Sequence, residues 1–286
     1  MAKKKANEKS MILKLVMALI VLLLSIVDLP KYFHSGLAFY AFDVGQGDAF
    51  LFLFPDGSNM LVDAGSRKYS KSLIDKLRRA GVGKIDILVA THPHEDHIGG
   101  MAEIIKAFPV EKIWHNGYNH GSMVQQNMLD IIHKRNIRFG RLKAGFVESI
   151  GDATVEVLAP RALISGTSSD ANNNSLALLV SLGEISFLLM GDLEEAGREK
   201  AGTFPHATIL KMAHHGSRNG VDRALLDEVD PEVAILTYGR ENPYGHPHAE
   251  TLALLEESGV PFYATVSGDI LIRTDGSEYS IEQKVR

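Results

Sequence analysis

The chain has 286 residues, 45% of them hydrophobic, which is enough to bury one large core or two small ones. It contains no cysteine, so disulfide frameworks and thiolate metal sites are excluded, and any metal must be held by His, Asp, Glu or Asn. The net charge is −5, but residues 1–31 carry +4, which leaves −9 on the remaining 255 residues. This acidic remainder excludes the broad positive field of non-specific nucleic-acid binders, although not a local basic groove.

The amino-terminal segment is lysine-rich over residues 1–10 and apolar over residues 11–27, apart from Lys14 and Ser25. A helix over residues 11–29 would be about 28 Å long, close to the hydrocarbon thickness of a bilayer. Because the lysines precede the apolar run, residues 1–10 are expected in the cytoplasm and the rest of the chain outside. A cleaved signal peptide and a buried helix are the alternatives, but no small-x-small cleavage site follows the run.

We therefore predict two parts: a basic tail with a transmembrane or signal helix over residues 1–31, and a second domain over residues 35–286. The predicted location of that domain is extracellular, held at the cell membrane by a single pass, or secreted if the segment is cleaved.

Short apolar runs follow from residue 37 onward. Residues 37–44, 49–54 and 59–62 predict strands, because the turn sequences of residues 45–48 and 55–58 separate them. Residues 69–80 predict a helix with Leu73, Ile74 and Leu77 on one face. Residues 85–90 then predict a buried strand.

A cluster of ligand-type side chains follows this strand: His92, His94, Asp96 and His97 form a His-x-His-x-Asp-His motif. Three imidazoles and a carboxylate are costly to bury without partners, and a divalent cation satisfies all four. His92 and His94 can converge on one ion, whereas Asp96 and His97 point more naturally to a second. Zinc is the expected ion, with manganese as the alternative because only nitrogen and oxygen ligands are present. The alternative is a His-rich surface loop that binds no metal, but this spacing would then have arisen by chance.

The rest of the chain alternates strands and helices. Residues 101–108, 123–134, 194–200, 221–228 and 249–258 predict helices, and residues 161–174 are polar and loop-like. Predicted strands cover residues 112–114, 154–158, 175–182, 185–190, 208–212, 233–238, 262–265, 268–273 and 278–282. Strand runs with helices after each half favour an α/β fold with two packed sheets flanked by helices.

Further ligand-type residues follow strands of the second half, namely Asp192, the pair His214–His215, and His246. Adjacent side chains on a strand point in opposite directions, so we expect one histidine of the pair to face the metals and the other to support it. A site in the seam between the two halves would gather ligands from both.

The His cluster together with Gly191-Asp192 at a strand end resembles the metallo-β-lactamase-fold hydrolases. Five stretches resemble, more narrowly, the extracytoplasmic hydrolase domain of ComEC-type competence proteins; they are residues 42–49 (Phe-Asp-Val-Gly-Gln-Gly-Asp-Ala), 62–65, 172–175, 210–217 (Leu-Lys-Met-Ala-His-His-Gly-Ser) and 242–247. The resemblance covers about residues 37–275. ComEC proteins also carry a multi-helix membrane channel, whereas this chain has at most one predicted span, so we expect a stand-alone, membrane-anchored relative.

The resemblance implies a four-layer αββα sandwich with a two-metal site. In the family pattern His92 and His94 bind the first ion, Asp96 and His97 bind the second, Asp192 bridges both, and His246 matches the last ligand. Many members supply a third histidine to the first ion where this chain has residues 172–175, Asn-Asn-Asn-Ser. The first ion then has a weaker ligand set, or His214 or His215 completes it.

Other residues are predicted to support the ligands or contact the substrate; they are Asp48, Asp63, Asn172, Ser175 and Lys211. Asp63 is expected to accept a hydrogen bond from a ligating imidazole, with capping of the next segment as the alternative.

Together these residues predict a metal-dependent hydrolase, foremost a phosphodiesterase or nuclease that acts on DNA outside the membrane. Two ions about 3.5–4 Å apart would activate a water and clamp phosphoryl oxygens. Asp192, His214 and His215 are the predicted catalytic residues, one histidine stabilising the transition state or protonating the leaving oxygen. The alternatives are a hydrolase of another surface substrate, such as a phosphocholine or teichoic-acid ester, a lactam or a lactone, and a metal-binding accessory domain with little turnover.

Overall fold

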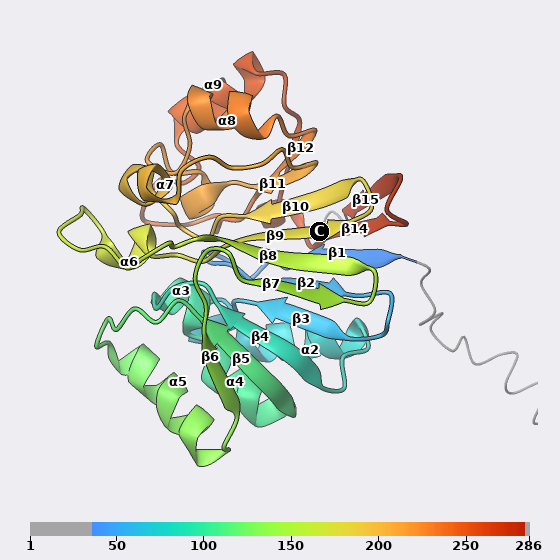
Figure 1. The fold of residues 1–286 in the computed structure, drawn as a ribbon, viewed down its shortest axis with the longest axis vertical. Coiled ribbons are helices and arrows are strands. Elements are labelled where there is room, and N and C mark those ends of the chain that lie inside the picture. The colour runs from blue at the N-terminus through green and yellow to red at the C-terminus, as the bar shows by residue number, and fades with distance from the viewer. Residues whose placement is uncertain (1–35, 284–286) are drawn as a thin grey trace, which may run out of the picture. The chain divides into compact units, whose positions relative to one another are not determined.

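Two β-sheets form the centre of the chain in the computed structural model, which describes residues 36–283 (Figure 1). The eight-stranded sheet has the order β15-β14-β1-β2-β3-β4-β5-β6. Its strands are β1 Leu37–Ala41, β2 Phe50–Leu53, β3 Asn59–Val62, β4 Ile85–Ala90, β5 Val110–His115, β6 Arg138–Arg141, β14 Ile270–Thr274 and β15 Tyr279–Gln283.

The seven-stranded sheet has the order β13-β12-β11-β10-β9-β8-β7. Its strands are β7 Val147–Ile150, β8 Ala153–Ala159, β9 Ala177–Leu182, β10 Ile185–Leu189, β11 Ile209–Lys211, β12 Val233–Leu236 and β13 Phe262–Ala264. Each sheet combines antiparallel pairs with a parallel run, β3 to β6 in the first and β10 to β13 in the second.

Helices cover the outer face of each sheet. The longer helices are α2 Ser70–Arg79, α4 Met101–Ala107, α5 Met123–Lys134, α7 Glu195–Ala201, α8 Arg223–Val229 and α9 Ala249–Glu257. Single turns are η1 Arg67–Tyr69, α3 Glu95–Ile98, α6 Asp170–Asn173, η2 Ala213–Gly216 and η3 Thr265–Ser267. In Figure 1, α2, α4 and α5 lie against the first sheet, and α7, α8 and α9 lie on the side of the second.

Three apolar cores explain why so many strands are apolar on both faces. Between the sheets, side chains of both interdigitate; Phe39 and Phe52 contact Phe187 with ring centroids 5.1 and 5.7 Å apart. A second core joins the first sheet to α2, α4 and α5, and a third joins the second sheet to α7, α8 and α9. The two-sheet α/β fold with flanking helices is therefore confirmed, and its layers follow the expected order helix, sheet, sheet, helix.

The carboxyl ends of the parallel strands position the functional residues. Asp63 follows β3, His92 and His94 follow β4, Asp192 follows β10 and the His214–His215 pair follows β11. Ligand sites in α/β sheets commonly form at such strand ends.

Most elements lie within a few residues of the prediction, and β3 and α5 have the predicted bounds. The strand predicted over residues 37–44 ends at Ala41, because the chain then turns into the loop that contains Gly45 and Gly47, both with positive φ. Strands β6 and β7 were not predicted, and residues 170–173 of the predicted loop form α6.

Within residues 36–283 no helix is long and apolar enough to cross a membrane. The predicted anchor over residues 11–29 lies outside the described residues, so the membrane location and its alternatives stay predictions.

Candidate metal centre

The loop between β4 and α3 presents the His cluster at the edge of the first sheet. His94 is the residue before α3, and Asp96 and His97 lie in that single turn, so the four ligand-type side chains all come from residues 92–97. His92 and His97 are buried, and the rings of His92 and His97 have centroids 4.1 Å apart. This crowding of imidazoles fits a common cation better than apolar packing.

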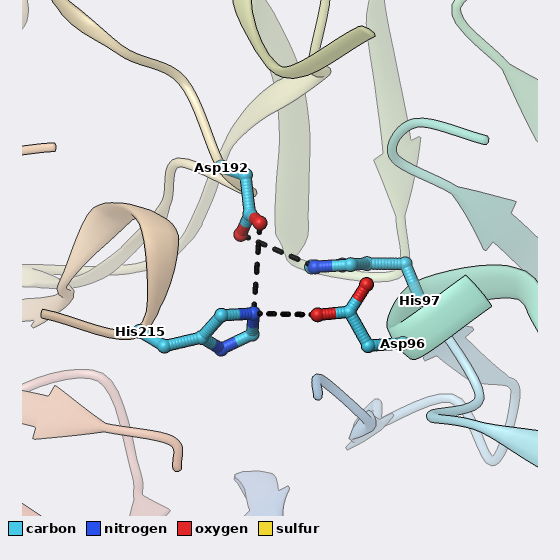
Figure 2. A group of neighbouring side chains, drawn as sticks. All are labelled: Asp96, His97, Asp192 and His215. Atoms are coloured by element: carbon cyan, nitrogen blue, oxygen red, sulfur yellow. Dashed lines mark ion pairs between the residues drawn. The ribbon is translucent and has the colours of Figure 1, made fainter. Parts of the chain in front are cut away.

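Two groups of potential metal ligands share Asp192. The first contains His92, His94 and Asp192, and the second contains Asp96, His97, Asp192 and His215. In the second group, shown in Figure 2, the His97 Nε2 atom lies 3.2 Å from Asp192 Oδ1. His215 Nε2 lies 3.2 Å from Asp96 Oδ2 and 3.5 Å from Asp192 Oδ2. The structure thus brings Asp192 to the His cluster from the other half of the chain.

Three buried atoms of the second group lack a hydrogen-bond partner in the described part of the chain: His97 Nε2, His215 Nε2 and Asp192 Oδ1. Unsatisfied buried polar atoms are rare and costly, so several that converge on one point call for a ligand. Imidazole nitrogen and carboxylate oxygen are the donors that zinc and related ions accept. The residues present therefore fit a divalent metal.

Asp63 orients His97 from behind. Its backbone is left-handed (φ 58°), and its carboxylate accepts hydrogen bonds from Thr91 N (2.9 Å), Thr91 Oγ1 (2.6 Å) and His97 Nδ1 (2.7 Å). This arrangement places the proton of His97 on Nδ1 and leaves Nε2 facing Asp192. Carboxylates in this position fix the tautomer and orientation of ligating histidines.

A buried ion pair lies beneath the site. The Lys211 ammonium is 2.5 Å from Asp48 Oδ2, 3.2 Å from the Gly191 carbonyl and 3.9 Å from Asp192 Oδ1, and both Lys211 and Asp48 are inaccessible to solvent. Asp48 also accepts a hydrogen bond from Thr237 Oγ1. Asp48, Asp63 and His97 form a third potential metal group, but the Lys211 ammonium already compensates Asp48.

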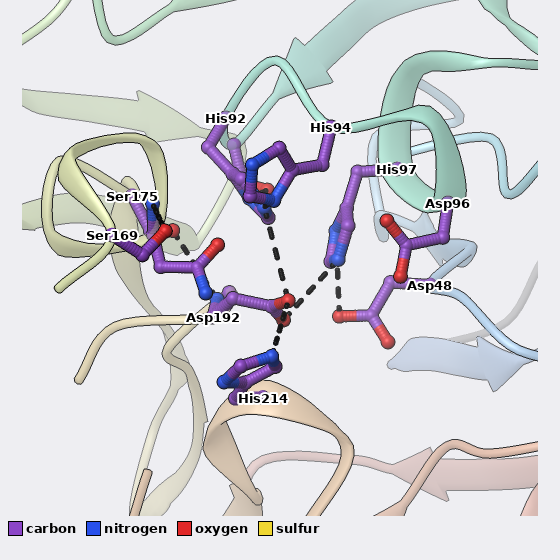
Figure 3. A network of polar contacts seen from close by, with 12 residues as sticks. Asp48, His92, His94, Asp96, His97, Ser169, Ser175, Asp192 and His214 are labelled. Carbon is purple, nitrogen blue, oxygen red and sulfur yellow. Dashed lines mark hydrogen bonds and ion pairs between the residues drawn. The ribbon is translucent and has the colours of Figure 1, made fainter. Parts of the chain in front are cut away.

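The two adjacent histidines diverge because the chain turns there. His214 and His215 both have left-handed backbone angles within η2, with φ of 49° and 55°, so the alternation of a strand does not apply to them. His215 directs Nδ1 to the Thr237 carbonyl (2.9 Å) and Nε2 to the second metal group. His214 is partly exposed, and its Nε2 lies 3.8 Å from Oδ2 of the shared carboxylate of Asp192 (Figure 3).

His246 lies beside this centre but in neither of the two groups that share Asp192. Its ring centroid is 5.2 Å from that of His214 and 6.1 Å from that of His215, and its buried Nδ1 has no partner among the described residues. His215 lies beside Asp96 and His97 in the second group, and the ligand role of His246 stays a prediction.

The support predicted around the first ion takes a specific form. Ser175 Oγ accepts a hydrogen bond from Asp192 N and so fixes the backbone of Asp192, whose carboxylate is shared by the two groups. Asn172 Nδ2 donates to Glu194 Oε1 (3.2 Å), and His214 Nδ1 lies 3.1 Å from the same oxygen. Sequence reasoning missed Glu194, because nothing in residues 191–195 distinguishes it from the adjacent Glu195.

Charge pairing controls the pKa values of the centre. Burial lowers the pKa of His215, but Asp192 and Asp48 raise it to about 9, and Asp192 and Asp63 likewise hold the pKa of His97 well above its usual value despite burial. Burial would raise the pKa of Asp192, whereas His97 and His215 hold it far below its usual value. The second group thus binds protons that a divalent cation would replace.

The centre opens into a pocket of about 1010 Å³. His94, Asp96, Asp192 and the His214–His215 pair line its floor, and Lys68, Tyr69, Arg240 and Tyr244 are among the residues that line the rest. The pocket is large enough for a ligand of drug or dinucleotide size.

The family model of the metallo-β-lactamase superfamily matches residues 42–240, a span that includes both metal groups. The chain belongs to the metallo-β-lactamase superfamily. Solved structures with this fold include YhfI from Bacillus subtilis (TM-score 0.54, 14% identity, covering 84% of this chain and all of that one). CmlA from Streptomyces venezuelae, a diiron β-hydroxylase, has a TM-score of 0.55 at 12% identity and covers 82% of this chain and 54% of its own. These likenesses show the fold alone.

Curated relatives at higher identity are competence proteins, as the resemblance predicted. ComE operon protein 3 of Bacillus subtilis is 29% identical over 238 residues, which are 76% of this chain and 30% of that protein. Recombination protein 2 of Haemophilus influenzae is 29% identical over 97% of this chain and 34% of its own length. Competence protein ComA of Neisseria gonorrhoeae is 29% identical over 72% of this chain and 27% of its own. The chain spans about a third of the length of these relatives.

Proposed function

We propose that this chain is a metal-dependent phosphodiesterase that acts on nucleic acid. The main support is that potential ligand atoms from both halves of the chain converge on Asp192. They form two groups that share this carboxylate, and several of them have no hydrogen-bond partner among the described residues. A shared carboxylate between two ligand groups is the arrangement of two-metal hydrolases, which cleave phosphate esters among other substrates.

His92, His94 and Asp192 would hold one divalent ion, and Asp96, His97, Asp192 and His215 the other, with zinc as our first choice and manganese as the alternative. Bound there, the ions would supply an activated water and polarise phosphoryl oxygens. Asp63 and the Thr237 carbonyl would keep His97 and His215 oriented, since each accepts from the Nδ1 atom of one ring.

His214 is the pocket residue best placed to meet the substrate. Its side chain is 22% exposed, whereas those of His97 and His215 are almost completely buried, and its Nε2 faces the pocket side of Asp192. When both ring nitrogens carry a proton, the Nε2–H group there can donate to a phosphoryl or leaving-group oxygen, which supports the predicted catalytic role.

Two features favour a nucleic-acid chain over a small neutral substrate. Lys68 and Arg240 are exposed cations that line the pocket, and neither forms an ion pair within residues 36–283, so both are available to phosphates. Tyr69 and Tyr244 line the same pocket and offer rings on which bases can stack. The names of the curated relatives refer to competence and recombination, which also favours DNA as the substrate.

The test is hydrolysis by the purified full chain loaded with Zn²⁺ or Mn²⁺. We expect the enzyme to cleave at least one of four phosphodiester substrates: single-stranded DNA, double-stranded DNA, RNA and bis-p-nitrophenyl phosphate. A phosphocholine ester and a lactam are tested in parallel. Cleavage of either of these without any phosphodiester of nucleic acid would replace the proposal by the corresponding alternative, and bound metal without any turnover would indicate an accessory domain.

A further inference from the structure

Glu194 occupies the N-cap position of α7, yet its side chain does not cap that helix. An acidic side chain at an N-cap ordinarily accepts from a free backbone N–H of the first turn. Here the buried carboxylate turns the other way, and its Oε1 lies 3.1 Å from His214 Nδ1. Glu194 therefore lacks the stabilising N-cap hydrogen bond, and its carboxylate lies beside His214 instead.

Two donors hold this carboxylate in place. Asn172 Nδ2 donates to Glu194 Oε1 at 3.2 Å, and Ser168 Oγ donates to Oε2 at 3.0 Å. Ser168 lies just before α6 and Asn172 lies within it, 26 and 22 positions from Glu194 in the sequence. Asn172 is buried and also lines the pocket, so the chain Ser168–Glu194–His214 ends at the candidate metal centre.

His214 needs such a partner, because its ring has few other restraints. It is partly exposed, its backbone is left-handed, and its Nε2 lies 3.8 Å from Asp192 Oδ2. His97 and His215, by contrast, are buried and each has an acceptor at Nδ1. Glu194 Oε1 lies 3.1 Å from His214 Nδ1 and Asp63 Oδ2 lies 2.7 Å from His97 Nδ1, although only the contact to His97 has hydrogen-bond geometry among the described residues.

We propose that Glu194 is a positioning residue: it keeps the proton of His214 on Nδ1 and holds Nε2 over Asp192 inside the pocket. A neutral free histidine prefers the proton on Nε2, so an acceptor at Nδ1 is required to select the other tautomer. The proposal concerns the orientation of the ring, and only its effect on turnover rests on the proposed function.

The substitutions Glu194→Ala and Glu194→Gln separate orientation from charge. Alanine removes the acceptor. Glutamine can keep its amide oxygen at the Oε1 position, towards His214 and Asn172, while its NH₂ group donates to Ser168 Oγ, because a hydroxyl can also accept. We expect Glu194→Gln to retain the orientation of His214 and Glu194→Ala to lose it. Glu195→Ala, at the exposed position next to Glu194, is the matched control.

The first readout is the ¹⁵N spectrum of the histidine rings in the zinc-loaded full chain, with His214 assigned from His214→Ala. We expect Nδ1 of His214 to carry the proton in the parent, in Glu194→Gln and in Glu195→Ala. In Glu194→Ala the signals should move towards the Nε2–H tautomer while the zinc content stays that of the parent. An unchanged His214 tautomer in Glu194→Ala would overturn the proposal, and so would a loss of zinc.

The second readout is a double-mutant cycle on bis-p-nitrophenyl phosphate. Glu194→Ala should lower kcat about 10- to 100-fold with little change in KM, and Glu194→Gln should lower it less. In the His214→Ala background, Glu194→Ala should have no further effect, because the residue acts only through that ring. Additive losses would contradict the proposal. If the parent cleaves no phosphodiester, the proposed function fails, whereas the ¹⁵N result still decides the role of Glu194.

Discussion

The two halves of the molecule supply ligands in different ways. The first half places His92, His94, Asp96 and His97 within six consecutive residues, on one loop and one helical turn. The second half supplies Asp192 and His215 from two separate strand ends, 23 positions apart. Only the second pattern requires the tertiary fold to bring the residues together, and Asp192 is the residue through which the two patterns meet.

The supporting residues show the same contrast. His97 is oriented by Asp63 from the neighbouring strand of the same sheet. Around the second-half ligands, Lys211 pairs with Asp48 of the first half, and Glu194 holds His214 with help from Asn172. The centre is therefore built from residues of both halves. Substitution of a residue that contacts both halves should reduce activity or stability more than substitution of a residue that contacts only one.

Removal of the shared carboxylate should have the largest effect. In Asp192→Asn both ligand groups lose their common oxygen, so we expect turnover to fall by about 10⁴-fold or more, as when a catalytic group is removed from other hydrolases. Hydrolysis of bis-p-nitrophenyl phosphate measures the loss. Asp152→Asn, at an exposed position, is the control and should match the parent. Activity near the parental level in Asp192→Asn would remove Asp192 from the mechanism.

Breaking the buried pair beneath the centre should mainly reduce stability. Lys211→Met leaves the Asp48 carboxylate buried without its cation, which costs about 3–5 kcal/mol when one partner of such a pair is removed. Chemical denaturation of the parent and variant measures the free energy of unfolding. Adding Asp48→Asn should recover part of the loss. Arg218→Met, which breaks the exposed pair with Glu250, should change little, and an equal loss there would show that burial is not the cause.

Loss of the carboxylate behind His97 should weaken metal binding without abolishing it. Asp63→Asn removes the charged acceptor of His97 Nδ1, so we expect affinity for the zinc ion held by His97 to fall about 10- to 100-fold. Competition with a chromophoric chelator gives the two affinities. Glu103→Gln, at a partly exposed position of α4, provides the comparison. Unchanged affinities in Asp63→Asn would mean that the hydrogen bond is only structural.

Metal binding should depend on pH in a defined direction. The pKa of His215 is raised to about 9 and that of His97 also lies above its usual value, so both rings carry protons at pH 7 that zinc must displace. Affinity should therefore rise with pH, by up to about tenfold per pH unit for each proton released, and the contribution of His215 should level off above about pH 9. Calorimetry in buffers of different ionisation enthalpy counts the protons. Binding without proton release at pH 7 would contradict the assignment of these rings as ligands.

The sequence alone reveals the parts that are local. The His cluster is recognisable because its members lie within six residues, helix α5 from its apolar pattern, and strand β3 as an apolar run that follows a turn sequence. Strands β6 and β7 escape prediction because they are four residues long and mostly exposed or only partly buried, so they lack an apolar pattern. Such short strands depend on their neighbours in the sheet rather than on their own residues.

The long-range pairings could not be predicted in the same way. Lys211 and Asp48 each stand in a recognisable motif, but no local signal indicates that they meet. The directions of His214 and His215 depend on two consecutive left-handed residues, a conformation that histidine adopts only when the surrounding structure imposes it. For the same reason, only the tertiary structure shows that His215 lies beside Asp96 and His97 rather than beside His92 and His94.

The most direct measurement is anomalous X-ray scattering at the zinc edge from crystals of the zinc-soaked full chain. Two peaks about 3.5–4 Å apart are expected, one on either side of the Asp192 carboxylate, with His92 and His94 at one and His97 and His215 at the other. No peak within bonding distance of Asp192, or a single peak bound only by residues 92–97, would contradict a metal centre shared between the two halves.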